Sequence, residues 1–186
     1  MKLNLPLLLT LGRVAVIPAV LLLFYVPWPY ARQLATVLYA VACITDWFDG
    51  WLARRWNQTS RFGAFLDPVA DKLLVAVCLV MLLHDRPTGM LAALVAIIIG
   101  REITVSALRE WMAELGQRTS VGVSWIGKLK TGFQMTAIGL MIWEIPLFWL
   151  PIYELGFALL FIAAALTLYS MLIYLRAAWP LMREHA

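Results

Sequence analysis

Six long apolar segments constrain this chain more than any other feature. They span about Pro6 to Val26, Ala31 to Trp56, Phe65 to Leu83, Met90 to Leu115, Lys128 to Trp143 and Leu155 to Ala178. A helix needs about 20 predominantly apolar residues to cross a bilayer. Of all residues, 63% are hydrophobic and only 14% are charged, whereas soluble domains carry about 25% charged residues. We therefore expect an all-α membrane protein, a six-transmembrane-helix bundle in a single domain over residues 1–186.

The basic residues indicate how such a bundle would be oriented. Of the 15 Lys and Arg, only Arg32 and Arg86 lie on the side away from the N-terminus, which leaves 13 on the other side or in the adjoining helix halves. Positive charge accumulates on the cytoplasmic side of membrane proteins. We expect both termini and the active site to face the cytoplasm. The net charge of +4 then reflects orientation, and we expect no nucleic-acid partner.

The opening "MKLNLPLLLTLGR" could be taken for a targeting segment. Its apolar run is not followed by the small-residue cleavage site of a signal peptide. We expect the first helix to be retained.

Four aspartates stand at the facing ends of the second and third segments: Asp46, Asp49, Asp67 and Asp71. Spacings of three and four residues place each pair on one helix face. Four carboxylates at low dielectric repel one another strongly, and one or two divalent cations would relieve this. Oxygen ligands favour Mg²⁺, Mn²⁺ or Ca²⁺ over zinc.

The neighbours of these aspartates fit a bulky anionic ligand. Gly50 and Ala53 follow on the same side of the second helix, and Gly63 lies between the two pairs, so space is left beside the carboxylates. Arg54 adds a cation where a phosphate could bind. An inert, solvated acidic rim is the alternative, but ionisable residues inside membranes are costly and usually functional.

Basic residues on the fourth and fifth segments suggest a second anionic ligand. Arg101 and Arg109 are eight residues apart, about 80° around a helix, and Lys128 and Lys130 begin the next segment. A phosphorylated acceptor would use such cationic donors. Ordinary cytoplasmic flanking charge is the alternative reading. Glu102 is expected to pair with Arg101 or with Arg109.

The aspartate spacing resembles the signature of the CDP-alcohol phosphatidyltransferases. Every defined position is filled in Asp46-x2-Asp49-Gly50-x2-Ala53-Arg54-x8-Gly63-x3-Asp67-x3-Asp71. The resemblance implies a six-helix membrane enzyme, usually a homodimer, that displaces CMP from a CDP-linked lipid with an alcohol. It also implies that Asp46, Asp49, Asp67 and Asp71 bind two divalent cations, Mg²⁺ or Mn²⁺. Asp71 would further be the general base on the acceptor hydroxyl.

Further segments resemble one branch of that family. These are "LPLLLTLGRVAVIP", "REI…SALREWMAELG" and "SWIGKLKT". The branch implies a bacterial inner membrane, CDP-diacylglycerol as lipid donor and sn-glycerol 3-phosphate as acceptor, with phosphatidylglycerophosphate and CMP as products. Thr10 and Arg13 would contact the nucleotide or diphosphate together with Gly50, Ala53, Arg54 and Gly63, and the four basic residues would bind the acceptor phosphate. Leu7 stands where many members carry Asn, which removes an amide contact near the nucleotide.

Other functions remain open at this point. The same chemistry could serve inositol phosphate or another alcohol as acceptor. A divalent-cation transporter would need polar ligands near the bilayer midplane and a path to the far side, but the outer halves of the segments carry almost no charge. A purely structural membrane protein would not explain the aspartate spacing.

Overall fold

A computed structural model describes residues 5–56, 61–114 and 125–185. All six expected helices are present in it: α1 Leu5–Leu23, α2 Ala31–Trp56, α3 Arg61–Asp85, α4 Gly89–Glu114, α5 Trp125–Trp143 and α6 Ile152–His185. Within the described residues there is no strand, only one isolated bridge between Leu147 and Leu150 in the last turn. The prediction of an all-α fold with six helices is confirmed.

Three helices extend further than the apolar segments indicate. The third begins at Arg61 rather than near Phe65, the fifth begins at Trp125 rather than near Lys128, and the sixth continues past Ala178 to His185. Hydropathy marks only the apolar part of a helix, whereas backbone hydrogen bonding continues through polar residues. The α3 extension places Asp67 and Asp71 in the second and third turns of a regular helix rather than at its first turn.

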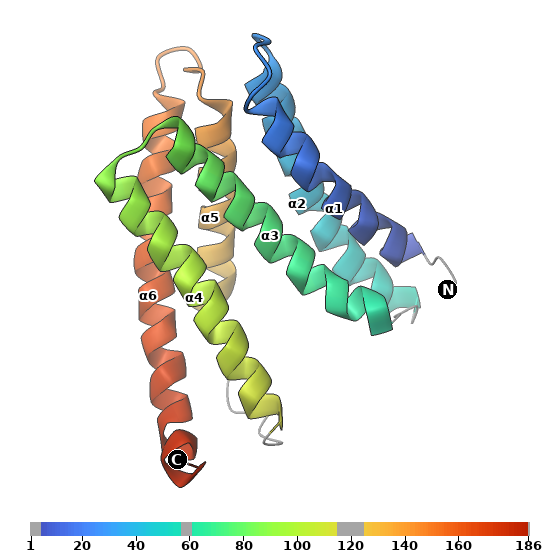
Figure 1. The fold of residues 1–186 in the computed structure, drawn as a ribbon, viewed down its shortest axis with the longest axis vertical. Coiled ribbons are helices and arrows are strands. Elements are labelled where there is room, and N and C mark those ends of the chain that lie inside the picture. The colour runs from blue at the N-terminus through green and yellow to red at the C-terminus, as the bar shows by residue number, and fades with distance from the viewer. Residues whose placement is uncertain (1–4, 57–60, 115–124, 186) are drawn as a thin grey trace.

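The six helices pack so that α5 meets both α2 and α3 near the middle (Figure 1). The first helix packs on α2 and α3, α5 packs most extensively on α6, and α4 packs on α6. Contacts of α2 with α5, and of α3 with α4 and α5, join these groups. Buried apolar residues of several helices form the core, among them Tyr39, Leu82, Ile98, Ile138 and Leu160.

The helices alternate in direction, so each end of the molecule collects a defined set of termini. The turns joining α1 to α2, α3 to α4 and α5 to α6 lie at the upper end in Figure 1. The start of α1 and the end of α6 lie toward the lower end. The carboxylates of α2 and α3 are therefore on the same side as the two chain termini.

Ion pairs connect neighbouring segments at the end of the molecule where these three turns lie. Arg32 pairs with Asp85, and Arg86 pairs with Glu144 at 2.5 Å. The hydrogen bond to Glu144 raises the pKa of Arg86 above its ordinary value. The only two basic residues expected on this side therefore both have carboxylate partners.

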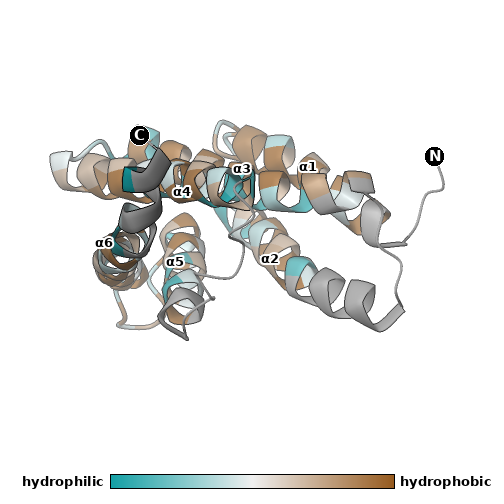
Figure 2. Cartoon of the chain, turned by 90° about the horizontal axis from the view of Figure 1, so that it is seen from below, coloured by the Kyte–Doolittle hydropathy of each residue, from teal (hydrophilic) through white to brown (hydrophobic). Residues whose placement is uncertain are grey.

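Much of the surface is apolar, as expected for helices in lipid. Figure 2 shows apolar colouring along much of the helices, and every helix exposes large hydrophobic side chains, such as Leu22, Ile44, Phe65, Ile103 and Leu172. Contiguous apolar surface of this kind marks a membrane or protein contact. Among the described residues, α4 and the Ile152–Arg176 part of α6 are long and apolar enough to cross a membrane, while the apolar Leu8–Leu23 stretch is shorter.

Candidate active site

Two of the four signature aspartates meet at a buried arginine. Asp46 on α2 and Asp71 on α3 each have a side chain about one-third exposed, and Arg13 on α1 is almost fully buried. The Arg13 Nη1 atom lies 3.0 Å from Asp46 Oδ1 and 2.6 Å from Asp71 Oδ1. One cationic nitrogen thus draws together oxygens from two helices and offsets their mutual repulsion.

The third signature aspartate is held by the same first helix. The Thr10 hydroxyl donates a hydrogen bond to Asp67 Oδ1, and Thr10 is itself buried. Thr10 and Arg13 are three residues apart and so share one face of α1. In this structure the two residues expected to contact the nucleotide or diphosphate are instead bonded to the carboxylates.

Several expected site residues lie outside the side chains that the structure describes. Asp49, Gly50, Ala53 and Arg54 belong to α2, and Lys128 belongs to the first turn of α5, but only their helical backbone is described. Asp49 follows Asp46 by three residues on α2. Gly63, expected in the loop between the second and third helices, is buried within α3.

The donor set suits a hard divalent cation. Among the described side chains, no group of three or more His, Cys, Asp or Glu is placed to hold a metal, and Asp49 falls outside that set. Asp46 and Asp71 nevertheless aim two carboxylate oxygens at one cationic atom. Carboxylate oxygens are the ligands that Mg²⁺ and Mn²⁺ prefer, so these residues fit such an ion if it replaces the Arg13 guanidinium.

A polar pocket opens beside this pair. Its volume is about 180 Å³, and α2, α3, α4 and α5 line it with Asp46, Asp71, Lys72, Val75, Glu102, Thr131, Gln134 and Met135. Gln134 is 5% exposed, and its Oε1 atom accepts no hydrogen bond within the described part of the chain. A buried amide oxygen without a donor is costly, so the pocket offers an acceptor for a ligand hydroxyl or amine.

The basic residues of α4 and α5 are organised by Glu102. The Glu102 Oε1 atom accepts hydrogen bonds from Arg101 Nη1 at 2.8 Å and from Lys130 Nζ at 2.9 Å. Arg101 also donates to the Ser170 hydroxyl on α6. The expected pairing of Glu102 with Arg101 is confirmed. Glu102 also lines the polar pocket, so it connects two of the predicted acceptor-binding cations to a pocket residue.

Arg109 lies apart from this group. Two turns further along α4, its Nη2 atom donates to the Tyr174 hydroxyl on α6 at 2.9 Å, and the guanidinium lies over the Tyr174 ring. The alternative pairing of Arg109 with Glu102 is therefore wrong. In this structure the α6 tyrosine holds Arg109, and Arg101 and Lys130 are the pair that the fold brings together.

Three polar residues of the pocket were not predicted from the sequence: Lys72, Thr131 and Gln134. Lys72 directly follows Asp71 in the chain, and this adjacency was the signal that could have singled it out. Thr131 and Gln134 stand one position and one turn after Lys130 on α5. Polar residues at helical spacing inside an apolar segment are the signal there.

Comparisons with known proteins identify the family of this chain. A profile of the CDP-alcohol phosphatidyltransferases matches residues 3–175. Proteins of Salmonella choleraesuis (strain SC-B67) and of Escherichia coli (strain K12) are 53% and 54% identical to this chain over 178 residues, and the match covers 96% of each chain. Both relatives are named CDP-diacylglycerol–glycerol-3-phosphate 3-phosphatidyltransferase. The chain therefore belongs to the CDP-alcohol phosphatidyltransferase family.

Proposed function

We propose that this protein transfers the phosphatidyl group of CDP-diacylglycerol to sn-glycerol 3-phosphate, giving phosphatidylglycerophosphate and CMP. The observation that carries the proposal is the convergence of Asp46 and Asp71 beside a pocket lined by Glu102, which pairs with Arg101 and Lys130. In this proposal the carboxylates would serve a cation and a proton, and the cations paired with Glu102 would bind a phosphate. The names of relatives more than half identical along 96% of the chain support the choice of substrates.

The donor side of the reaction belongs to α1, α2 and α3. Asp46, Asp49, Asp67 and Asp71 would hold Mg²⁺ or Mn²⁺, and such ions would neutralise the charge that develops on the phosphate of the leaving CMP. Thr10, Arg13, Gly50, Ala53, Arg54 and Gly63 would bind the CDP group of the lipid. Arg13 must then exchange carboxylate partners for ligand oxygens, which its five N–H donors permit.

The acceptor side belongs to α4 and α5. The phosphate of glycerol 3-phosphate would bind Arg101, Arg109, Lys128 and Lys130, which orients the acceptor hydroxyl toward α3. Asp71 takes the hydroxyl proton as the oxygen attacks the lipid-linked phosphorus. The new phosphorus–oxygen bond replaces the bond between the lipid-linked phosphorus and CMP, and CMP leaves.

The setting of the proposed reaction is a bacterial inner membrane. We place all six helices across it, with both termini and the pocket on the cytoplasmic side, in a homodimer of single-domain chains over residues 1–186. The exposed apolar surface and the apolar lengths of α4 and α6 support the membrane location. At the depth of the polar pocket, a water-soluble acceptor would meet a donor whose acyl chains stay in lipid.

An acceptor panel tests the proposal. Protein purified in detergent with Mg²⁺ and CDP-diacylglycerol is assayed for CMP release with glycerol 3-phosphate, inositol 1-phosphate, inositol and serine in parallel. We expect release with glycerol 3-phosphate alone, and loss of it in Asp71→Asn. Release with inositol phosphate or another alcohol would keep the reaction class and overturn the acceptor. Absence of release with every acceptor, in folded and Mg²⁺-supplied protein, would overturn the enzyme assignment.

A further inference from the structure

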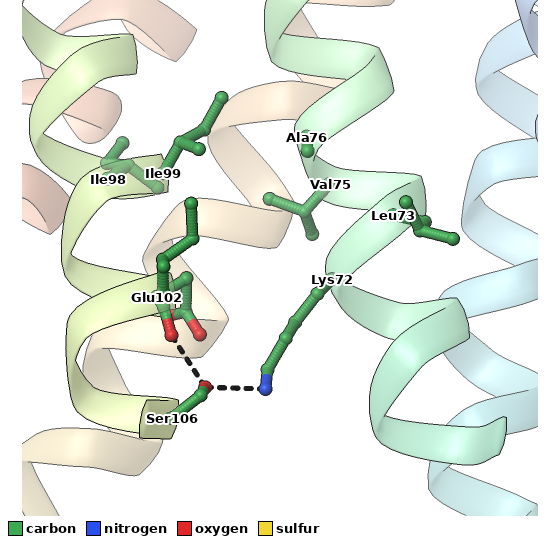
Figure 3. Close-up of a pocket in the computed structure, with 9 residues that line it drawn as sticks. Lys72, Leu73, Val75, Ala76, Ile98, Ile99, Glu102 and Ser106 are labelled. Carbon is green, nitrogen blue, oxygen red and sulfur yellow. Dashed lines mark hydrogen bonds between the residues drawn. The ribbon is translucent and has the colours of Figure 1, made fainter. Parts of the chain in front are cut away.

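Lys72 stands where two pockets meet. It lines the polar pocket that holds Asp46 and Asp71, and it also lines a second pocket of about 380 Å³ between α3 and α4. We call this second one the α3–α4 pocket. Its walls are Lys72, Leu73, Val75, Ala76, Ile98, Ile99, Glu102, Ile103 and Ser106 (Figure 3). Most of that lining is hydrocarbon, and Lys72, Val75 and Glu102 are common to both pockets.

The Lys72 ammonium is held in place by a neutral partner. Its Nζ atom donates to the Ser106 hydroxyl at 2.5 Å, and that hydroxyl donates its own proton to the Glu102 backbone carbonyl at 2.6 Å (Figure 3). Ser106 therefore presents an oxygen lone pair to Lys72. A lysine ammonium has three N–H donors, so this contact fixes its position and leaves two donors for a ligand.

The charge of Lys72 has no ion-pair partner in the part of the chain that the structure describes. Among the residues that the structure describes, no carboxylate lies within ion-pair distance of its Nζ atom, whereas Arg13 pairs with Asp46 and Asp71, and Lys130 pairs with Glu102. An ammonium without an acidic partner, beside a pocket for phosphates, favours an anionic ligand.

The α3–α4 pocket reaches the apolar surface of the protein. Leu73 and Ile103 line it, and they are 48% and 65% exposed. A ligand that used both pockets would be anionic where it meets Lys72 and hydrocarbon beyond it. Glycerol 3-phosphate has no hydrocarbon chain to place there, but a phospholipid has both parts.

We propose that Lys72 contacts a phosphate oxygen of the lipid donor while one acyl chain of the same lipid occupies the α3–α4 pocket. The inference rests on the proposed function and extends it, since it names where the lipid crosses from polar to apolar surroundings. Lys72 is then a substrate-contact residue for the donor, and Ser106 is a positioning residue that acts through Lys72.

Steady-state kinetics test the phosphate contact. In Lys72→Met we expect the KM for CDP-diacylglycerol to rise about ten-fold or more, as for loss of a charge-assisted hydrogen bond. The KM for glycerol 3-phosphate should stay within about two-fold, because only the donor loses a contact. Lys72→Arg should restore much of the lipid affinity, and Arg176→Met, an exposed cation on α6, is the control. An unchanged lipid KM, or an equal rise in both KM values, would overturn the contact.

The length of the donor's acyl chains tests whether one of them occupies the α3–α4 pocket. Ala76→Phe fills the α3–α4 pocket, and Val80→Phe places the same ring on the exposed face of α3 as a matched control. We expect Ala76→Phe to raise the KM for a dipalmitoyl donor more than that for a dioctanoyl donor, whereas Val80→Phe leaves their ratio unchanged. An equal effect on both donors would overturn the assignment of an acyl chain. A change of oligomeric state without a change in the KM ratio would also overturn it. That result would indicate that the pocket is an interface between copies of the chain.

The wild-type protein separates failure of this inference from failure of the proposed function. If wild-type protein releases CMP with glycerol 3-phosphate while the Lys72 and Ala76 variants behave like their controls, the inference alone is wrong. If wild-type protein releases no CMP with any acceptor, the proposed function fails first and the inference falls with it.

Discussion

Arg13 brings together carboxylates from two different helices. It is almost fully buried, and its guanidinium contacts one aspartate from α2 and one from α3. Removing one partner from a buried ion pair costs about 3–5 kcal/mol, since the remaining charges lose their compensation. A single residue of α1 therefore stabilises a site formed mainly by other helices.

This role predicts a change in how metal affects stability. Arg13→Met should lower the melting temperature in EDTA, because Asp46 and Asp71 then face each other without a cation. Added Mg²⁺ should raise the melting temperature of the variant more than that of the wild type, since no guanidinium competes for the same oxygens. Thermal unfolding in detergent checks this, with the exposed Arg183→Met as control. Equal Mg²⁺ responses in variant and wild type would contradict a shared cation position.

Glu102 leads to a second prediction for a single residue. Its carboxylate holds both Arg101 and Lys130, so Glu102→Gln should loosen the two cations. We expect the KM for glycerol 3-phosphate to rise about five-fold or more, from weaker positioning of a phosphate-binding pair. The measurement is CMP release against acceptor concentration, with exposed Glu110→Gln on the same helix as control. If Glu102→Gln matched that control, Arg101 and Lys130 would not bind the acceptor.

For single residues, the sequence predicts their chemical role better than it predicts their contacts. The aspartate spacing alone predicted Asp46, Asp49, Asp67 and Asp71 as a group, because spacing within a helix determines which face a side chain occupies. The pairing of Glu102 with Lys130 joins residues 28 apart, and that of Arg13 with Asp71 joins residues 58 apart. Such contacts depend on how helices pack, which periodicity within one helix does not specify.

The pairing of α5 with α6 depends on one glycine. A Cβ atom at Gly156 would lie 2.8 Å from Met141 Cγ and 2.9 Å from the Ala137 carbonyl oxygen. The methionine side chain can move aside, but a backbone oxygen in a packed helix cannot do so without shifting α5. Small residues at such points let helix backbones approach closely in membranes.

Gly156→Ala should therefore destabilise the protein. We expect a loss of about 1–3 kcal/mol, the usual cost of overpacking a tight interface. Gly132→Ala on α5 is the matched control, because its added Cβ meets nothing within 4 Å. Denaturant unfolding in detergent compares the two variants. If both variants unfolded at the same denaturant concentration as the wild type, the helices would not meet closely at Gly156.

The helices themselves could be predicted almost completely. The second helix spans Ala31–Trp56, as its apolar pattern and the preceding prolines indicate, while α5 begins at Trp125, three residues before the expected Lys128. The early start of α3 falls on polar Arg61, where helix hydrogen bonding outlasts apolar character, whereas α1 ends at Leu23, three residues short of the expected Val26. Which helices pack together did not follow from the sequence, because six apolar segments offer similar surfaces to one another.

The orientation of the whole molecule makes a further prediction. In a Cys43→Ala, Cys78→Ala background, a cysteine replacing Trp149 in the turn before α6 should react with a membrane-impermeant thiol reagent in intact cells. Trp149 is 89% exposed, so access would be limited only by the membrane. A cysteine replacing Arg183 near the end of α6 should react only after the cells are opened. The reverse pattern would place the carboxylate pocket on the wrong side for a cytoplasmic acceptor.

The central claim is that the whole molecule joins a water-soluble phosphate ester to a lipid at the carboxylate pocket. The most direct measurement follows ¹³C-labelled glycerol 3-phosphate into the organic phase and identifies the labelled lipid by mass spectrometry, for wild type, Asp46→Asn and Asp71→Asn. We expect labelled phosphatidylglycerophosphate, with CMP in equal amount, from the wild type only. Label that stays in water while CMP is released, or equal labelling of lipid by the aspartate variants, would contradict the account.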